Sequence, residues 1–409
     1  MHSYYEVEVS MLGCLKAERG KDHHALFIAF GSVIDSRLPT KDYLSSMANK
    51  NLNAAKTAKK DEFYTQMSDI ERELQHYWQH FRGKTILCNC DDPYESNFFK
   101  YFALRFNQLG LKKLICTCYN GSPVQGDELM IDWGDFSEEP KKIAYKVEIT
   151  EVRDLNGDGA VDLSDVQYLL QNDKNVLSIL KTGDFRHPEC IDLLKQADIV
   201  VTNPPFSLFR EYIAQLIEYE KKFLIIGNVN AISNKNFFPL LYTGRVWNGV
   251  NSGHTWFKVP EYYEIPDFYD LTDTKKLRSN GYAIKDGRLW RNLGNICWFT
   301  NLDNKKRHEF IDLIRSVKHT EYCEFDNYQA IEVGNVNDIP YDYDGIMGVP
   351  ITFMHKYNPE QFELLGITEN DPKMKEYWKD GALKYDRPYL KGQRKPARLL
   401  IRNKNPKII

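Results

Sequence analysis

The fold is set by one stretch of the sequence, Asp198-Ile-Val-Val-Thr202-Asn203-Pro204-Pro205-Phe206. Its first five residues form a short apolar run that is typical of a buried β-strand. Pro204 and Pro205 fix φ and lack N–H donors, and a proline pushes the residue before it toward an extended conformation. The stretch therefore predicts a strand that ends in a rigid corner, which carries the Asn203 amide and the Phe206 ring.

Such a corner suits the binding of a planar base that carries an exocyclic amino group. The Asn203 side-chain oxygen and the Pro204 carbonyl could accept the two amino hydrogens, and Phe206 could stack on a base extruded from its duplex. A plain turn between a strand and a helix is the alternative interpretation. The place of the corner at the carboxyl end of an apolar strand favours base binding, because ligands of α/β sheets bind there.

Strands and helices alternate on both sides of this stretch. A capping-box spacing of Ser68 and Glu71 predicts where the first helix begins. The alternation of short apolar strands with helices implies an α/β fold, with a mostly parallel sheet covered on both faces. Strands are expected at 84–90, 113–118, 198–202 and 223–227, and helices at 68–81, 96–109, 207–219 and near 304–317.

The composition is that of an ordinary globular protein. The 409 residues are 42% hydrophobic and 27% charged, with a formal net charge of −3, so a nucleic-acid site would have to be a local basic patch. No stretch approaches the roughly 18 apolar residues of a membrane-spanning helix, and the N-terminus lacks a signal pattern. Because the eight cysteines are dispersed, we expect reduced thiols and a cytoplasmic protein.

The corner and its surroundings resemble the S-adenosylmethionine-dependent amino-methyltransferases, and within them the EcoRI-type adenine-specific DNA methylases. The resemblance covers most of residues 50–245 and, more loosely, the C-terminal part. It implies a Rossmann-like methyltransferase sheet, S-adenosylmethionine as cofactor, and methyl transfer to N6 of a flipped-out adenine in double-stranded DNA. The residues that match the catalytic motif of the family are Asn203, Pro204, Pro205 and Phe206.

Three further segments resemble cofactor-binding motifs of that family. The resemblance assigns the methionine end of the cofactor to Phe63, Tyr64 and Thr65, the acidic loop to Asp91, Asp92 and Pro93, and the adenine to Asp184 and Phe185. The family loop usually continues with a Gly-x-Gly pair, which Glu95 to Phe98 replace here. No acid follows the strand 113–118, so Tyr119 or Asn120 would have to bind the ribose.

The residues by themselves leave other roles open for these motifs. Asp91 and Asp92 could simply cap the following helix, which carboxylates favour. Asp184 could be a turn acid, and Tyr64 and Phe185 could be packing residues. The two Cys-x-Cys pairs, at 88 and 90 and at 116 and 118, are spaced for one face of a strand and are interpreted as core residues.

An insertion contains a pattern of oxygen donors that fits the EF-hand register and looks most like the dockerin version. Hard oxygen donors at this spacing can wrap Ca²⁺, and the glycine at the sixth position allows the sharp turn. An Asx-rich turn that caps the helix 163–170 is the alternative. The predicted calcium ligands are Asp154, Asn156, Asp158, Ala160, Asp162 and Asp165, with Ala160 using its carbonyl.

The C-terminal segment is strongly basic. Its cations could bind DNA phosphates, and a solvated basic tail is the alternative. Tryptophans at 247, 256, 290 and 298 suit base recognition and core packing equally well. The proposed phosphate-binding residues are Lys391, Arg394, Lys395, Arg398 and Arg402.

These inferences give a domain plan and a function. The plan has an N-terminal extension (1–45), a catalytic domain (46–125 and 180–245), an inserted hairpin-helix element (126–179), and a C-terminal mixed α+β region for DNA target recognition (246–409). Methylation of cytosine N4 or of RNA adenine, and a catalytically silent DNA-binding protein of the same fold, are alternative functions. A cognate restriction endonuclease is a further expected partner, and the oligomeric state stays open.

Overall fold

The computed structural model describes most of the chain beyond the N-terminal segment. The described residues, from 65 onward, belong to one compact unit. The expected N-terminal extension, the start of the insertion, and Phe63, Tyr64, Tyr119, Asn156, Asp158 and Ala160 lie outside the described residues. The described residues are 65–118, 144–154, 157, 161–172, 177–259, 274–285, 287–369, 371–381 and 386–407.

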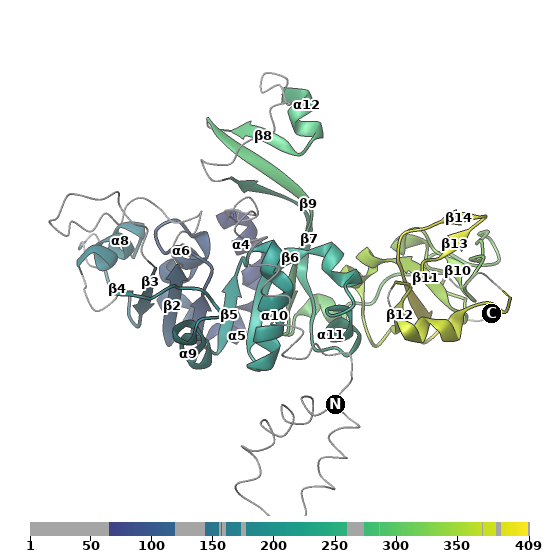
Figure 1. Ribbon diagram of the computed structural model, residues 1–409, viewed down its shortest axis with the longest axis horizontal. Coiled ribbons are helices and arrows are strands. Elements are labelled where there is room, and N and C mark those ends of the chain that lie inside the picture. The colour runs from purple at the N-terminus through teal and green to yellow at the C-terminus, as the bar shows by residue number, and fades with distance from the viewer. Residues whose placement is uncertain are drawn as a thin grey trace, which may run out of the picture. The chain divides into compact units, whose positions relative to one another are not determined.

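A nine-stranded mixed sheet forms the centre of the described structure and is consistent with a Rossmann-like α/β fold (Figure 1). Its order is β4-β3-β2-β1-β5-β6-β9-β7, with β8 paired to β9. The four central strands are parallel, whereas β3, β4, β7, β8 and β9 join their neighbours antiparallel, so the expectation of a mostly parallel sheet was wrong outside the centre. The strands are β1 (Thr85–Cys88), β2 (Lys113–Cys118), β3 (Tyr145–Ile149), β4 (Leu177–Ile179), β5 (Ile199–Thr202), β6 (Lys222–Asn228), β7 (Trp247–Lys258), β8 (Tyr282–Lys285) and β9 (Arg288–Thr300).

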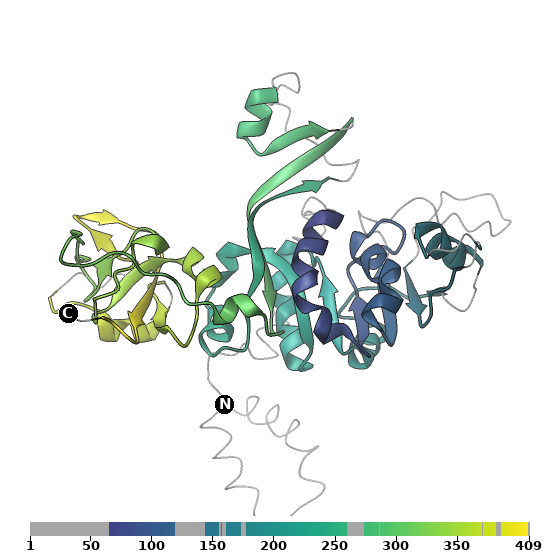
Figure 2. The same cartoon turned by 180° about the vertical axis from the view of Figure 1, so that it is seen from behind.

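Helices cover both faces of this sheet, because successive side chains of its buried central strands point to opposite sides. Ile86 of β1 packs in a core with α4 and α6, while its neighbour Leu87 packs in a second core with α9 and α10. Figure 1 shows the α10 side and Figure 2 the α4 side. The α-helices are α4 (Met67–Leu74), α5 (Trp78–Phe81), α6 (Asn97–Leu104), α7 (Phe106–Leu109), α8 (Leu163–Asn172), α9 (Pro188–Gln196), α10 (Phe209–Glu218), α11 (Phe238–Tyr242) and α12 (Thr274–Ser279).

Three helix predictions differ from the structure. They concern the start of one helix, the continuity of a second and most of the length of a third. The helix α4 begins at Met67 behind Gln66, so Ser68 lies inside the first turn and does not cap it. The segment 96–109 is two helices that break at Arg105. Near 304–317 only Lys305–His308 is helical, as a 3-10 turn, because Gln361 binds the backbone N–H and carbonyl of Ile311 on the extended chain that follows.

A second, four-stranded sheet with the order β10-β11-β15-β12 lies in the C-terminal part. Val349 and Ile401 of this sheet belong to the same apolar cluster as Ile225 and Phe299 of the large sheet. In the described residues after α12, every helix is of the 3-10 type, and none of the described helices is long and apolar enough to cross a membrane. The remaining elements are η1 (Gln75–Tyr77), η2 (Phe206–Leu208), η3 (Val229–Ser233), η4 (Lys305–His308), η5 (Val336–Asp338), η6 (Ile351–Lys356), η7 (Pro372–Tyr377), β10 (Ile331–Glu332), β11 (Met347–Pro350), β12 (Phe362–Ile367), β13 (Tyr389–Leu390), β14 (Gln393–Arg394) and β15 (Arg398–Asn403).

Candidate active site

The diproline corner lies where the strand order of the large sheet reverses. The strand β1 pairs with β2 on one side and with β5 on the other, with Leu87 opposite Val200. Ligands of open α/β sheets bind at the carboxyl ends of the strands at such a switch point. The loop after β1 and the corner after β5 therefore emerge side by side at the expected place.

A buried carboxylate ties these two segments together. Asp91 accepts hydrogen bonds from Ser96 Oγ at 2.7 Å and from Thr202 Oγ1 at 2.5 Å. Burial raises the pKa of Asp91 to about 6, against the lowering effect of these two hydrogen bonds. Because Thr202 directly precedes Asn203, the Asp91–Thr202 bond sets the position of the corner relative to the loop.

The rest of the loop after β1 is held by side chains from other elements. Asp92 Oδ1 accepts bonds from the backbone N–H of Tyr94 and from the hydroxyl of Tyr145 on β3, each at 2.8 Å. The Tyr212 hydroxyl of α10 donates to Asn89 Oδ1. Pro93 is buried within the same loop. No sequence pattern pointed to Asn89, Tyr145 or Tyr212, since their partners are more than 50 residues away.

The interpretation of Asp91 and Asp92 as helix caps receives no support from these contacts. Ser96 caps α6, since its hydroxyl accepts bonds from the N–H groups of Phe98 and Phe99. Thr65 lies beside the same loop, because its carbonyl accepts a bond of 2.7 Å from Asn97 Nδ2. Its hydroxyl is buried without a hydrogen-bond partner among the described residues. A buried hydroxyl and two neighbouring carboxylates offer hydrogen-bond partners for the α-ammonium group of S-adenosylmethionine.

The second predicted cofactor motif is already engaged in contacts within the protein. Both carboxylate oxygens of Asp184 accept bonds from the Arg186 guanidinium, at 2.9 and 2.6 Å. Burial opposes ionisation of Asp184, but the hydrogen bonds and the charge of Arg186 outweigh it and lower the pKa. Phe185 is buried and packs edge-to-face on Tyr212, with ring centroids 5.1 Å apart. Their assignment to the cofactor adenine stays a prediction.

The corner itself is partly accessible. Pro204 is buried, whereas Asn203, Pro205 and Phe206 are half-buried. The carbonyl of Pro205 accepts a bond of 3.0 Å from the N–H of Leu208, which begins the 3-10 turn that leads into α10. Phe206 packs at the margin of the core formed by α4 and α6. The corner is thus only partly exposed and the Asn203 side-chain oxygen is buried, so its binding of a base stays a prediction.

The contacts divide the C-terminal cations into two groups. Arg398 forms a nearly buried ion pair of 2.7 Å with Glu332, and Arg402 pairs with Glu363 at 3.1 Å. These two guanidiniums therefore form ion pairs between strands of the four-stranded sheet. Lys391 and Arg394 are exposed, and Lys395 is half-buried.

Three of the six predicted calcium ligands can be placed. Asp162 Oδ1 accepts bonds of 2.7 Å from the N–H and the hydroxyl of Ser164, and Asp165 accepts one of 2.9 Å from the N–H of Asp162. These bonds cap α8, as in the alternative interpretation. Asp154 Oδ1 accepts a bond from the N–H of Gly157. Within the described ranges, no group of three or more His, Cys, Asp or Glu side chains is placed to hold a metal ion.

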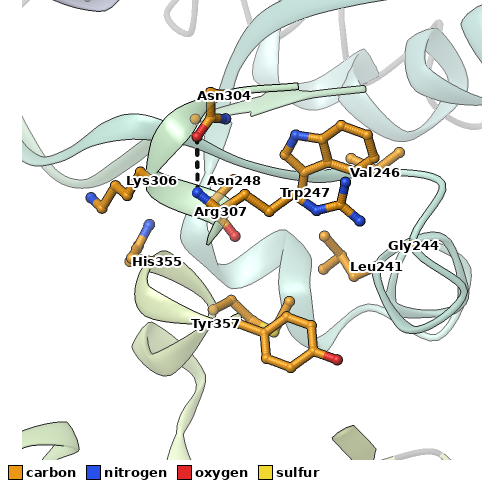
Figure 3. A pocket seen from close by; sticks show the side chains of 12 residues that line it. Leu241, Gly244, Val246, Trp247, Asn248, Asn304, Lys306, Arg307, His355 and Tyr357 are labelled. Atoms are coloured by element: carbon orange, nitrogen blue, oxygen red, sulfur yellow. Dashed lines mark hydrogen bonds between the residues drawn. The ribbon is translucent and has the colours of Figure 1, made fainter. Parts of the chain in front are cut away.

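A pocket lies at β7, away from the diproline corner (Figure 3). Trp247 and Asn248 line it from β7, Lys306 and Arg307 from η4, and His355 from η6. The Arg307 guanidinium lies 3.9 Å from the centre of the Trp247 ring, and burial together with Lys306 lowers the pKa of His355 to about 4. Since β7 is separated from β5 by β6 and β9, this pocket is distinct from the candidate active site.

The comparisons with known proteins agree with the geometry. Residues 51–404 match the family model of the adenine-specific methyltransferase EcoRI. The type II methyltransferase M.EcoRI of Escherichia coli is 46% identical over 354 residues, which cover 85% of this chain and 97% of that relative. No solved structure gives a significant match.

Two relatives from mycoplasmas extend the comparison. M.MgeORF184P of Mycoplasma genitalium is 35% identical over 78% of this chain and 87% of its own length. M.MpnI of Mycoplasma pneumoniae is 34% identical over 86% of this chain and 98% of its own length. Both are named type II methyltransferases. With the family model matching most of its length, the chain belongs to the EcoRI family of adenine-specific methyltransferases.

Proposed function

We propose that the chain transfers a methyl group from S-adenosylmethionine to N6 of a flipped-out adenine in double-stranded DNA. The observation that carries this proposal is the bond between Asp91 and Thr202, which holds the acidic loop and the diproline corner together at the switch point of the sheet. Family membership supplies the reaction class, and the relatives named type II methyltransferases suggest a partner endonuclease.

In this proposal the corner positions the reacting amine. The Asn203 side-chain oxygen and the Pro204 carbonyl accept one hydrogen bond each from the two N–H groups of the amine, so its lone pair is directed at the methyl donor. Phe206 stacks on the extruded base and offsets part of the cost of unstacking it. Positioning of two reactants in this way supplies much of the rate enhancement of a group transfer.

The cofactor would lie between the corner and the loop after β1. Thr65, Asp91, Asp92 and Pro93 would bind its amino-acid end, and Asp184 and Phe185 its adenine end. S-adenosylmethionine supplies a methyl group that is already activated by the adjacent sulfonium. The negative charge of the loop favours the sulfonium cation. Because burial raises the pKa of Asp91 to about 6, the charge of this carboxylate changes with pH near 6.

The test measures tritium transfer from labelled cofactor to duplex DNA, followed by nucleoside analysis. We expect N6-methyladenine with the wild-type chain and at least a hundredfold lower rate with Asn203→Ala, because one lost positioning hydrogen bond at a reaction centre costs roughly that much. Phe206→Ala should lower kcat/KM by about tenfold or more, since base stacking is worth about 1–3 kcal/mol.

The controls separate chemistry from folding. Phe310→Ala removes a ring that is 58% exposed and should leave the rate unchanged. Cofactor binding by Asn203→Ala, measured by calorimetry, should stay near that of the wild type. An active Asn203→Ala variant would refute the amine-binding role of the corner, and a labelled cytosine would refute the substrate assignment.

A further inference from the structure

The loop after β1, at residues 89–96, changes direction without glycine. Its sequence is Asn-Cys-Asp-Asp-Pro-Tyr-Glu-Ser, and none of its residues has a positive φ. Side chains of β3, β5 and α10 hold it instead, each through one hydrogen bond. The position of this loop therefore depends on hydrogen bonds to residues that are distant in the chain.

A fourth bond joins the end of the loop to the segment before α4. Asn97, the first residue of α6, follows the loop directly, and its Nδ2 donates to the carbonyl oxygen of Thr65 at 2.7 Å. The first helical bonds of α4 go to the Gln66 carbonyl, so the Thr65 carbonyl is available to the Asn97 amide. Thr65 is buried and Asn97 is half-buried, which shields this bond from water.

The apolar packing of the two helices does not by itself fix Thr65. The helices α4 and α6 pack against each other, and Ile70 and Leu74 of α4 share one core with Phe98 and Phe102 of α6 (Figure 2). Burial of apolar surface stabilises this pairing but is non-directional. A hydrogen bond is directional, so the Asn97 amide sets the orientation of the Thr65 backbone relative to the loop.

We propose that Asn97 is a positioning residue for the cofactor, which acts through Thr65. Its amide holds Thr65 beside the acidic loop, where the amino-acid end of S-adenosylmethionine binds in the proposed function. This inference rests on that function and deepens it. The residues assigned to the adenine, Asp184 and Phe185, have their own partners in Arg186 and Tyr212. Loss of the Asn97 amide should therefore weaken contacts with the amino-acid end alone.

The experiment measures binding to the full chain with two probes. S-adenosylhomocysteine, the demethylated by-product, keeps the amino-acid end of the cofactor. The second probe, 5′-methylthioadenosine, keeps the adenosine and the sulfur but lacks that end. Calorimetry gives the Kd of each probe for the wild type and for Asn97→Ala. Both probes are measured on the same preparation, so an unfolded fraction of the protein does not change the ratio of the two constants.

We expect Asn97→Ala to raise the Kd of S-adenosylhomocysteine by about 3- to 10-fold, which is the effect of one hydrogen bond between neutral groups. The Kd of 5′-methylthioadenosine should stay within about twofold of the wild-type value, because that probe does not reach Thr65. In methyl transfer, the KM for S-adenosylmethionine should rise more than kcat falls, because the diproline corner is intact.

The matched control is Asn107→Ala. Asn107 Nδ2 donates to the Val152 carbonyl at 2.8 Å, which is the same kind of bond. Asn107 lies in α7, ahead of the amino end of β2, whereas the loop follows the carboxyl end of β1. Since β1 and β2 are parallel, the two bonds lie toward opposite edges of the sheet. The control should leave both Kd values unchanged.

Two results would overturn the inference. One is a wild-type Kd for S-adenosylhomocysteine in Asn97→Ala. The other is an equal rise in the Kd of both probes, which would mean that Asn97 only supports the fold. Failure of the proposed function looks different, because the wild-type chain would then transfer no methyl group to DNA.

Discussion

Thr202→Val tests the bond that joins the acidic loop to the diproline corner. The substitution keeps the shape of the side chain and removes only the hydroxyl that donates to Asp91 Oδ2 at 2.5 Å. A buried hydrogen bond to a charged group contributes about 1.5–3 kcal/mol. At pH 8, where Asp91 is ionised, we therefore expect a loss of about 2 kcal/mol in the free energy of unfolding.

The loss should depend on pH in a defined direction. Burial has already raised the pKa of Asp91 to about 6, and the Thr202 bond is the first of the effects that lower it. Without that bond the pKa of the folded state rises further, so ionisation above pH 6 costs the variant more than the wild type. Below pH 6 the carboxyl group is protonated in both proteins, and the difference should shrink to about 1 kcal/mol or less.

The assay is urea unfolding at pH 5.5 and pH 8, with the rate of methyl transfer measured in parallel. Thr117→Val is the matched control, because Thr117 is fully buried on β2 and its hydroxyl has no hydrogen-bond partner among the described residues. It should cost little at either pH. Equal losses in the two variants at pH 8, or a loss in Thr202→Val that does not change with pH, would refute the reasoning.

Two further predictions concern parts of the structure outside the corner. Glu73→Ala should lower the free energy of unfolding in urea by about 3 kcal/mol. The reason is that the buried carboxylate accepts hydrogen bonds from the backbone N–H groups of Val250 and Asn251 in the irregular part of β7. Glu73→Gln should recover part of that loss. Calcium should raise the Tm relative to chelator if the 154–165 loop binds it. An identical Tm in both solutions would mean that the loop does not bind calcium and only caps α8.

The local features of the candidate site could be predicted from the sequence. The apolar run before Asn203 and the two prolines after it determine a strand and a rigid corner, whatever surrounds them. The strand 113–118 was predicted at its observed bounds. Cys88, Cys116 and Cys118 are buried thiols of one core, as the Cys-x-Cys spacing indicates. The prediction was wrong for Cys90, which follows the end of β1, is half-buried and packs against the other core.

The contacts that make these features into a site depend on the packed structure. Asp91 and Thr202 are 111 residues apart, and only the pairing of β1 with β5 brings them together. The same holds for Asp92 with Tyr145 and for Arg398 with Glu332. The helix predicted near 304–317 is only the 3-10 turn Lys305–His308, because Gln361 binds the backbone of Ile311 on the extended chain that follows.

The sequence by itself determined a strand with a diproline corner, the motifs that resemble a methyltransferase family, and an excess of cations in a few segments. Dihedral restriction and charge are properties of the residues themselves. The tertiary structure alone decided which carboxylate holds the corner and which cations are neutralised by acids. Those outcomes depend on strand order and register, which join residues that are distant in the chain.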